Sequence, residues 1–93
     1  MPYCTIVEFE WDETSDREGF AAALGQMEAG SVPPGRLSKI AGIDEKGARM
    51  IEVWRSSDDA RAFAENCTPS LAQSSIPPPS RVVGFEVTTY LVA

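Results

Sequence analysis

The sequence predicts a small α+β domain of the ferredoxin-like kind, with the element order βαββαβ. Three observations predict it: strand-like segments at both ends of the chain, two amphipathic segments preceded by helix-capping residues, and a tight turn between two central strands. In this topology one antiparallel sheet, of spatial order 4-1-3-2, carries both helices on one face. We expect residues 1–93 to form a single domain.

The first strand and the first helix follow from alternation and capping. Residues 3–10 are largely β-branched or aromatic with alternating character, which predicts a strand. Ser15 or Asp16 can cap the helix that follows, whose apolar residues recur at helical spacing. Gly30 and the Pro-Pro-Gly sequence at 33–35 are expected to end it.

A hairpin and a second helix come next. Residues 36–44 form a weaker strand, and the tight turn over 44–47 leads into a strand over 48–55. Ser57 is expected to cap the second helix, whose first turn is acidic and therefore matches the helix dipole. Pro69 is expected to kink or restart this helix.

The last strand is predicted to be long. Three successive prolines at 77–79 form a stiff extended connector, because none of them has an amide hydrogen to donate. Residues 81–92 then read as one strand, long enough to cross the sheet and project beyond it.

Both faces of the predicted sheet contain apolar residues, because the strands do not alternate cleanly between apolar and polar positions. Two helices can cover only one face. The other face would be a large exposed apolar patch, so we expect a homodimer in which two sheets pack face to face. The long last strand is expected to help join the two copies.

Composition excludes several partners. Eight basic residues stand against fourteen acidic ones, for a net charge of −6, so we expect no nucleic-acid partner and no binding to anionic membranes. No apolar run is long enough to cross a bilayer, and no export signal opens the sequence, so we expect a cytoplasmic protein. Cys4 and Cys67 lie among apolar residues and are expected to be reduced core cysteines.

The chain has no histidine, which removes histidine-dependent triads, haem pockets with a proximal histidine and most zinc sites. No glycine-rich phosphate-binding loop occurs either. We therefore expect an activity without cofactor or resident metal, carried by carboxylates, hydroxyls, Trp, Arg or the substrate itself.

Strand pairing suggests an acidic site. We expect Glu8, Glu52 and Glu86 to share one sheet face and converge, so that one carboxyl group keeps its proton and an acid and a base stand together. Tyr90, on the same predicted face, would supply a hydroxyl donor. The remaining contacts to a hydrophobic small-molecule substrate are expected from Trp54, Met50, Ile6, Phe63 and Thr88.

Two other interpretations of the glutamates stay open. Carboxylates on a sheet face commonly form ion pairs with arginine across a dimer interface, and the chain offers Arg36, Arg49, Arg55 and Arg81. The three carboxylates could also hold Mg²⁺ or Mn²⁺, which favour oxygen ligands, although they show no fixed ligand spacing.

The segment IEVWRS at 51–56, running directly into a helix that contains ARAF at 60–63, resembles the dimeric α/β-barrel superfamily. Within it, the chain is most similar to the antibiotic biosynthesis monooxygenase (ABM) family. The resemblance implies a pocket between sheet and helices lined by a tryptophan, which Trp54 matches. Met50 stands where quinone-forming members place an asparagine, and the missing histidine excludes the haem-degrading role.

Three function classes follow. The first is a cofactor-free enzyme that transfers protons on a polyketide-like or aromatic metabolite, as a cyclase or isomerase does. The second, implied by the resemblance, is a cofactor-independent monooxygenase of an aromatic metabolite. The third is a binding or interaction module without catalytic activity.

Overall fold

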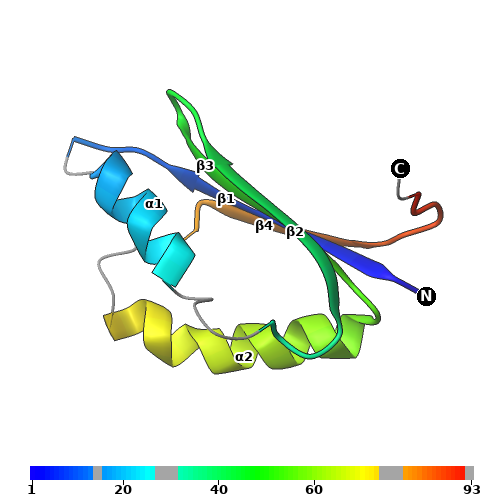
Figure 1. Ribbon diagram of the computed structural model, residues 1–93. Coiled ribbons are helices and arrows are strands. Elements are labelled where there is room, and N and C mark those ends of the chain that lie inside the picture. The colour runs from blue at the N-terminus through cyan, green and yellow to red at the C-terminus, as the bar shows by residue number, and fades with distance from the viewer. Residues whose placement is uncertain (14–15, 27–31, 74–78, 92–93) are drawn as a thin grey trace.

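The predicted order of elements is confirmed. The computed structural model describes residues 1–13, 16–26, 32–73 and 79–91, the side chains at 23–26 and 67–73 excepted. Its elements follow one another along the chain (Figure 1) as β1 (Tyr3–Glu10), α1 (Arg17–Gln26), β2 (Arg36–Ile43), β3 (Gly47–Trp54), α2 (Ser57–Gln73) and β4 (Arg81–Glu86).

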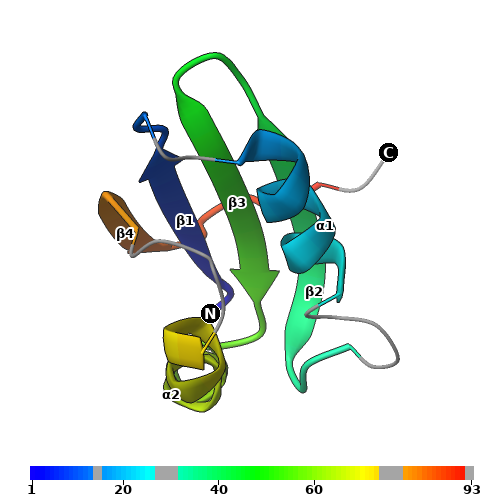
Figure 2. The same cartoon turned by 90° about the vertical axis from the view of Figure 1, so that its left-hand side faces the viewer.

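The sheet has the order β2-β3-β1-β4 with every neighbouring pair antiparallel, which confirms the predicted 4-1-3-2 arrangement. Both helices lie on the same side of this sheet (Figure 1). Helix α1 packs against β2, and α2 packs against β1 and β3. Figure 2 looks onto this helix-facing side and shows β4 at its edge, clear of both helices.

The helix caps agree in part with the sequence. The carboxylate of Asp16 accepts a hydrogen bond from the backbone N–H of Gly19, at 3.0 Å, and so caps α1, while Ser15 and Gly30 lie outside the described residues. The prediction that Ser57 caps α2 is wrong. Its neighbour Ser56 is the cap, since its Oγ accepts the N–H of Asp59 at 3.2 Å, and α2 then continues through Pro69.

The apolar core lies between α1 and the hairpin end of the sheet. It consists of the buried side chains of Phe9, Phe20 and Ala48. The rings of Phe9 and Phe20 meet edge to face with 4.9 Å between centroids, and Trp11 meets Phe20 in the same way at 5.3 Å. This cluster attaches α1 to β1 and β3.

The predicted turn between β2 and β3 is confirmed and is hydrogen-bonded to Trp11, the residue that follows β1. The carboxylate of Asp44 accepts N–H groups from Lys46 at 2.8 Å and from Gly47 at 2.9 Å. Hydrogen bonds from Gly47 and then Lys46 hold the pKa of Asp44 below its ordinary value. The indole N–H of Trp11 donates to the backbone oxygen of Asp44 at 2.8 Å.

The prediction of a long last strand is wrong, because β4 ends at Glu86. Glu86 is paired with Tyr3, the first residue of β1, so the neighbouring strand ends there too. One further hydrogen bond joins the N–H of Val87 to the oxygen of Pro2, at 2.8 Å. Thr88 and Tyr90 follow outside any strand, and Val92 lies outside the described residues.

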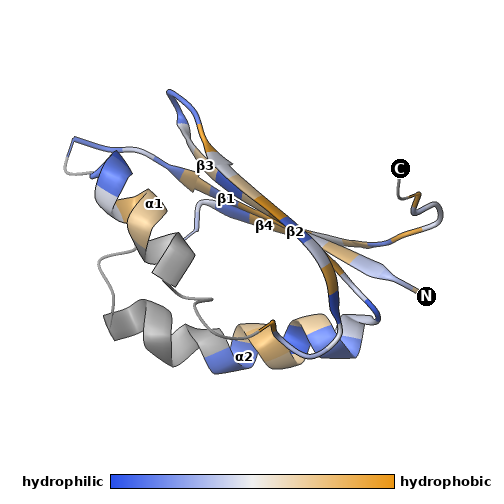
Figure 3. Cartoon of the chain, viewed as in Figure 1, coloured by the Kyte–Doolittle hydropathy of each residue, from blue (hydrophilic) through white to orange (hydrophobic). Residues whose placement is uncertain are grey.

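The sheet face turned away from the helices carries apolar residues, as the sequence predicts. On this face Ile40 is 69% exposed and Phe85 is 45% exposed. Cys4 lies on the same face as a free, buried thiol whose pKa is raised by burial, whereas the side chain of Cys67 lies outside the described residues. Figure 3 shows apolar and polar stretches mixed along the strands.

Among the described helices, none has the length and apolar character that crossing a bilayer requires.

Candidate functional site

The helix-facing side of the sheet is identified by its strand pairing. Residues directly opposite each other on neighbouring strands project from the same face. Tyr3 is opposite Trp54, and Thr5 is opposite Glu52. Because the ring of Trp54 lies 5.1 Å from that of Phe63 in α2, these side chains all lie on the face that the helices cover.

An ion pair is buried on this face. Arg36, the first residue of β2, places Nη1 at 3.1 Å from Oε2 of Glu52 in β3. The two side chains are only 8% and 4% exposed. Removing both charges from water is costly, so a buried pair of this kind depends on close geometry such as this.

The chain just before β2 positions Arg36. Gly35 has a φ of 83°, in the left-handed region that favours glycine, and a side chain there would collide with Asp59. The oxygen of Gly35 accepts the N–H of Arg55 at 2.7 Å. These contacts fix the start of β2 beside the junction of β3 and α2, where Arg36 reaches Glu52.

Trp54 ends β3 and is 1% exposed. Its indole N–H donates to Oγ1 of Thr5 at 3.2 Å, and its ring packs on Phe63. The cap at Ser56 starts α2 two residues later and so brings Phe63 over the indole. The indole is therefore a packed apolar group of this face, and its polar atom is already bonded.

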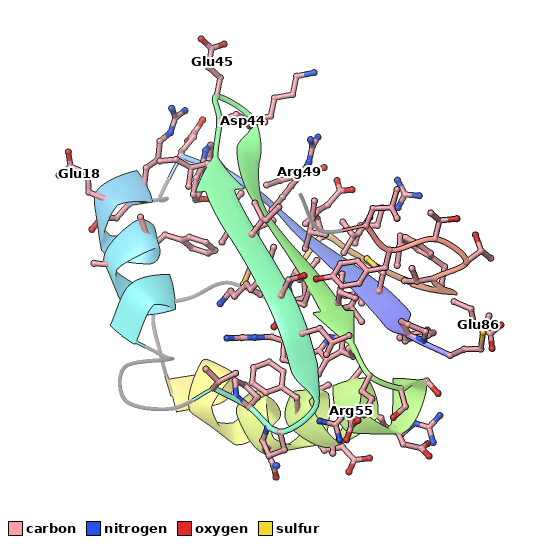
Figure 4. All side chains as sticks on the ribbon, turned by 45° about the vertical axis from the view of Figure 1, so that its right-hand side comes forward. Glu18, Asp44, Glu45, Arg49, Arg55 and Glu86 are labelled. Carbon is pink, nitrogen blue, oxygen red and sulfur yellow. The ribbon has the colours of Figure 1, made fainter. Side chains whose placement is uncertain are left out.

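The three glutamates do not converge, so the expected acidic cluster is wrong. Glu8 is opposite Arg49 on one side and Arg81 on the other, on the face away from the helices. Glu86 shares the helix-facing side with Glu52 but is exposed and lies at the end of β4. Figure 4 shows it at the far end of the sheet from Asp44.

The physical reason is the register. Paired residue numbers in β1 and β3 add to 57, so an even-numbered residue of β1 is opposite an odd-numbered residue of β3, as Glu8 is opposite Arg49. Glu8 and Glu52 therefore project from opposite faces. A shared metal site is excluded by the same separation, and among the described residues no group of three or more possible ligands could hold a metal ion.

The other predicted site residues are divided in the same way. Met50 is on the helix-facing side, where it packs against the core of Phe9 and Phe20. Ile6 is opposite Ile51 on the other face, away from Trp54. Thr88 and Tyr90 are exposed beyond the end of β4, because the strand is shorter than predicted.

Two residues of the site were not identified as site residues from the sequence. Arg36 was considered only as an ion-pair partner across a dimer interface, whereas the structure pairs it with Glu52 within the chain. Thr5 bonds the indole of Trp54. The position of Arg36 directly after a Pro-Pro-Gly sequence was the available signal, since such a sequence fixes where the following strand begins.

Part of the helix-facing side is open. On β4 it presents Val82, which is 62% exposed, followed by Gly84 and Glu86, both exposed as well. Thr5 lies between this open strip and the buried Glu52, since it is opposite Gly84 on one side and Glu52 on the other.

No protein-family description matches the sequence, and no curated protein is significantly similar to it. Solved structures share its fold. A structure named as an antibiotic biosynthesis monooxygenase from Chloroflexus aurantiacus is 20% identical, with a TM-score of 0.71 over 100% of both chains. A haem-degrading protein from Mycobacterium tuberculosis is 19% identical, with a TM-score of 0.64 over 99% of this chain and 100% of its own.

A third similar structure is a hydroxynitrile lyase from Passiflora edulis, 11% identical, with a TM-score of 0.66 over 97% of each chain. These comparisons confirm the ABM-like, ferredoxin-like fold. The three proteins are named for different reactions on that one fold, so the activity has to be argued from the residues of this chain.

Proposed function

We propose that the chain is a small-molecule enzyme of the ABM-like type that transfers protons on a hydrophobic aromatic or polyketide-like metabolite, without a cofactor. The observation that supports this most directly is the buried pair of Arg36 and Glu52 beside Trp54. A desolvated carboxylate next to an apolar wall is a suitable base for a weakly acidic C–H group.

The proposed step conserves charge within the site. Glu52 removes a proton from the carbon beside a substrate carbonyl, and the C–H electron pair moves onto the carbonyl oxygen as an enolate. Before the step Arg36 balances the carboxylate, and after it the same guanidinium balances the enolate. Return of the proton to a different atom completes an isomerisation, and attack of the enolate on a second carbonyl completes a cyclisation.

Exchange of an α-proton tests the step without knowledge of the natural substrate. The probe is 1-tetralone, a bicyclic aryl ketone, incubated with the protein in D₂O while its α-proton signal is followed by NMR. We expect wild-type protein to accelerate exchange over buffer, and Glu52→Gln, which keeps the shape of the side chain, to reduce the acceleration about 100-fold or more.

The matched control is Glu8→Gln, which removes the same charge from the opposite face of the sheet. It should exchange the probe as fast as wild type. Equal rates for Glu52→Gln and wild type, with both folded by circular dichroism, would contradict the proposed role of Glu52.

A cofactor-independent monooxygenase is the second candidate, favoured by Trp54 at the end of β3 and by the fold shared with a structure of that name. The substrate carbanion would react with dioxygen to a hydroperoxide, which loses water to leave a carbonyl group. With anthrone as probe, oxygen uptake should match formation of anthraquinone. Unchanged conversion of a substrate under anaerobic conditions removes this candidate.

We also propose a homodimer formed through the sheet face opposite the helices. Apolar side chains gather there around the strand centres, with Glu8 set between Arg49 and Arg81 across the neighbouring strands. Two copies could pair these charges around an apolar centre. Sedimentation should give twice the chain mass, and Phe85→Lys should give the mass of one chain; a wild-type monomer would contradict this proposal.

If the probe binds but wild type does not accelerate exchange, the third class, a binding module, is supported instead.

A further inference from the structure

The two outer strands of the sheet, β2 and β4, differ in how they protect their free edges. β2 has Lys39 near its centre and a shift in its pairing between Arg36 and Ser38. Lysines on an edge strand and irregular pairing are features by which natural sheets prevent a further strand from joining. β4 has neither, because Val-Val-Gly-Phe separates Arg81 from Glu86 and the pairing with β1 is regular between them. Of the two edges, that of β4 is therefore the less protected.

The outer edge of β4 is also uncovered. Figure 2 shows β4 as the outermost strand on its side of the sheet, clear of both helices. Five of its six residues are exposed, among them Val82 by 62% and Phe85 by 45%. Within the described ranges of the chain, β4 forms a ladder with β1 alone. Its outward-facing N–H and C=O groups are therefore accessible to a partner strand.

The outward-facing groups follow from the ladder between β4 and β1. The N–H of Val87, just after β4, donates to the oxygen of Pro2, just before β1, at 2.8 Å. In an antiparallel pair, successive residues direct their N–H and C=O groups alternately toward the neighbouring strand and away from it. The odd-numbered residues of β4 therefore bond to β1. The even-numbered residues Val82, Gly84 and Glu86 direct their N–H and C=O groups away from the sheet.

These three residues form a self-complementary set centred on Gly84. A second β4 strand can run antiparallel to the first with its own Gly84 directly opposite, so that Val82 lies opposite the partner's Glu86. Every outward-facing residue is then in a pair that exchanges two hydrogen bonds. Neither Arg81 nor Glu86 meets a like charge in this register, because Arg81 lies opposite the partner's Val87.

The side chains fit the same register. On the face away from the helices, Phe85 lies opposite the partner's Val83 in the closely spaced kind of pair that lacks hydrogen bonds, and aromatic–β-branched pairs of this kind stabilise antiparallel sheets. On the helix-facing side, the ring of Tyr3 covers Gly84, since a Cβ added there would lie 2.8 Å from Cζ of Tyr3. Because paired strands lie about 4.8 Å apart, the two tyrosine rings would meet across the symmetry axis.

We propose that a second copy of this chain pairs with the outer edge of β4, antiparallel and with the two Gly84 residues opposite each other. The twofold axis is perpendicular to the sheet, so the two sheets continue into one and the helices of both copies lie on the same side. This contact goes beyond the face-to-face dimer, because it uses the backbone of an edge strand and leaves the apolar face of the sheet free. One short strand buries little area, so the contact should form at higher protein concentration than that dimer.

The test separates this contact from the face-to-face dimer by using Ile40→Lys as background. Ile40 is 69% exposed on the face away from the helices and belongs to β2, at the opposite edge from β4. A lysine there should disrupt the face-to-face dimer and leave β4 unchanged. In sedimentation equilibrium, the mass of this variant should double as its concentration is raised. A mass that stays constant up to the solubility limit would overturn the inference, whether or not the face-to-face dimer exists.

Val82→Pro, made in the same background, identifies the edge that associates. Proline removes the amide hydrogen that Val82 directs outward and leaves the hydrogen bonds between β4 and β1 in place, so it should abolish the doubling of mass. The matched control is Val82→Ala, which keeps the amide hydrogen and should double in mass as the background does. Doubling that persists in folded Val82→Pro would place the contact elsewhere and overturn the inference. Circular dichroism shows whether each variant is folded.

Amide hydrogen exchange of the Ile40→Lys variant is a second measurement, and it needs no proline. The N–H of Gly84 faces outward and should exchange more slowly as the protein concentration is raised. The N–H of Val83 faces β1 and should exchange slowly at every concentration. A rate for Gly84 that does not depend on concentration would overturn the inference.

Discussion

The helix-facing side of the sheet has two halves that use the same strands differently. Near the hairpin end, Phe9, Phe20 and Ala48 form a core of apolar side chains with no polar atoms. At the other end, the same face holds the buried Trp54 and the buried ion pair of Arg36 and Glu52. Each half has one tryptophan, and each indole N–H has a partner: a backbone oxygen for Trp11 and a side-chain hydroxyl for Trp54.

The difference separates the residues that stabilise the fold from those to which the proposed function assigns the chemistry. Edge-to-face aromatic contacts add stability beyond their buried area. A buried ion pair contributes little net stability, since apolar residues of similar volume often do as well. The proposed function gives the pair of Arg36 and Glu52 a chemical role, whereas the aromatic cluster contributes to stability.

The largest effect on stability is expected in the apolar half. Phe20→Ala leaves a cavity against Phe9 and Trp11 and should lower the free energy of unfolding by about 4 kcal/mol, measured by urea denaturation. Phe20→Leu should lower the free energy of unfolding much less. Both variants should still accelerate exchange of the α-proton of 1-tetralone under conditions where they are folded. Loss of this activity in folded Phe20→Leu would show that the apolar half also contributes to the reaction.

The polar half should respond differently. Arg36→Met leaves the carboxylate of Glu52 buried without its guanidinium and should lower the free energy of unfolding by about 3 kcal/mol. The double variant Arg36→Met/Glu52→Leu should regain most of this stability but no catalysis of exchange. Recovery of exchange in the double variant would contradict the role assigned to the pair.

The smallest effect is expected at the hairpin turn, through pH. The pKa of Asp44 is lowered in the folded chain, so its carboxylate stabilises the fold above the ordinary value and this stabilisation is lost as pH falls through the folded pKa. Asp44→Ala should therefore lower Tm at pH 7, and the difference from wild type should shrink below about pH 4. A difference independent of pH would contradict this.

The sequence was sufficient for the order of elements, because each follows from local signals such as the alternation in β1 and the turn at Asp44. It was not sufficient for the site. Whether Glu8 and Glu52 share a face depends on a register that a shift of one residue reverses. The end of β4 depends on where β1 begins, since an edge strand stops when its neighbour does. Arg36 reaches Glu52 through a loop conformation at Gly35 that local patterns do not fix in space.

The two tryptophans allow the most direct test of the central claim that the polar half binds the substrate. In ¹⁵N-labelled protein they give two indole N–H signals, which Trp11→Phe assigns by removing one. On titration with 1-tetralone, we predict a saturable shift of the Trp54 signal and an unchanged Trp11 signal. A shift confined to Trp11, or no shift of either signal at the solubility limit of the ketone, would contradict the account.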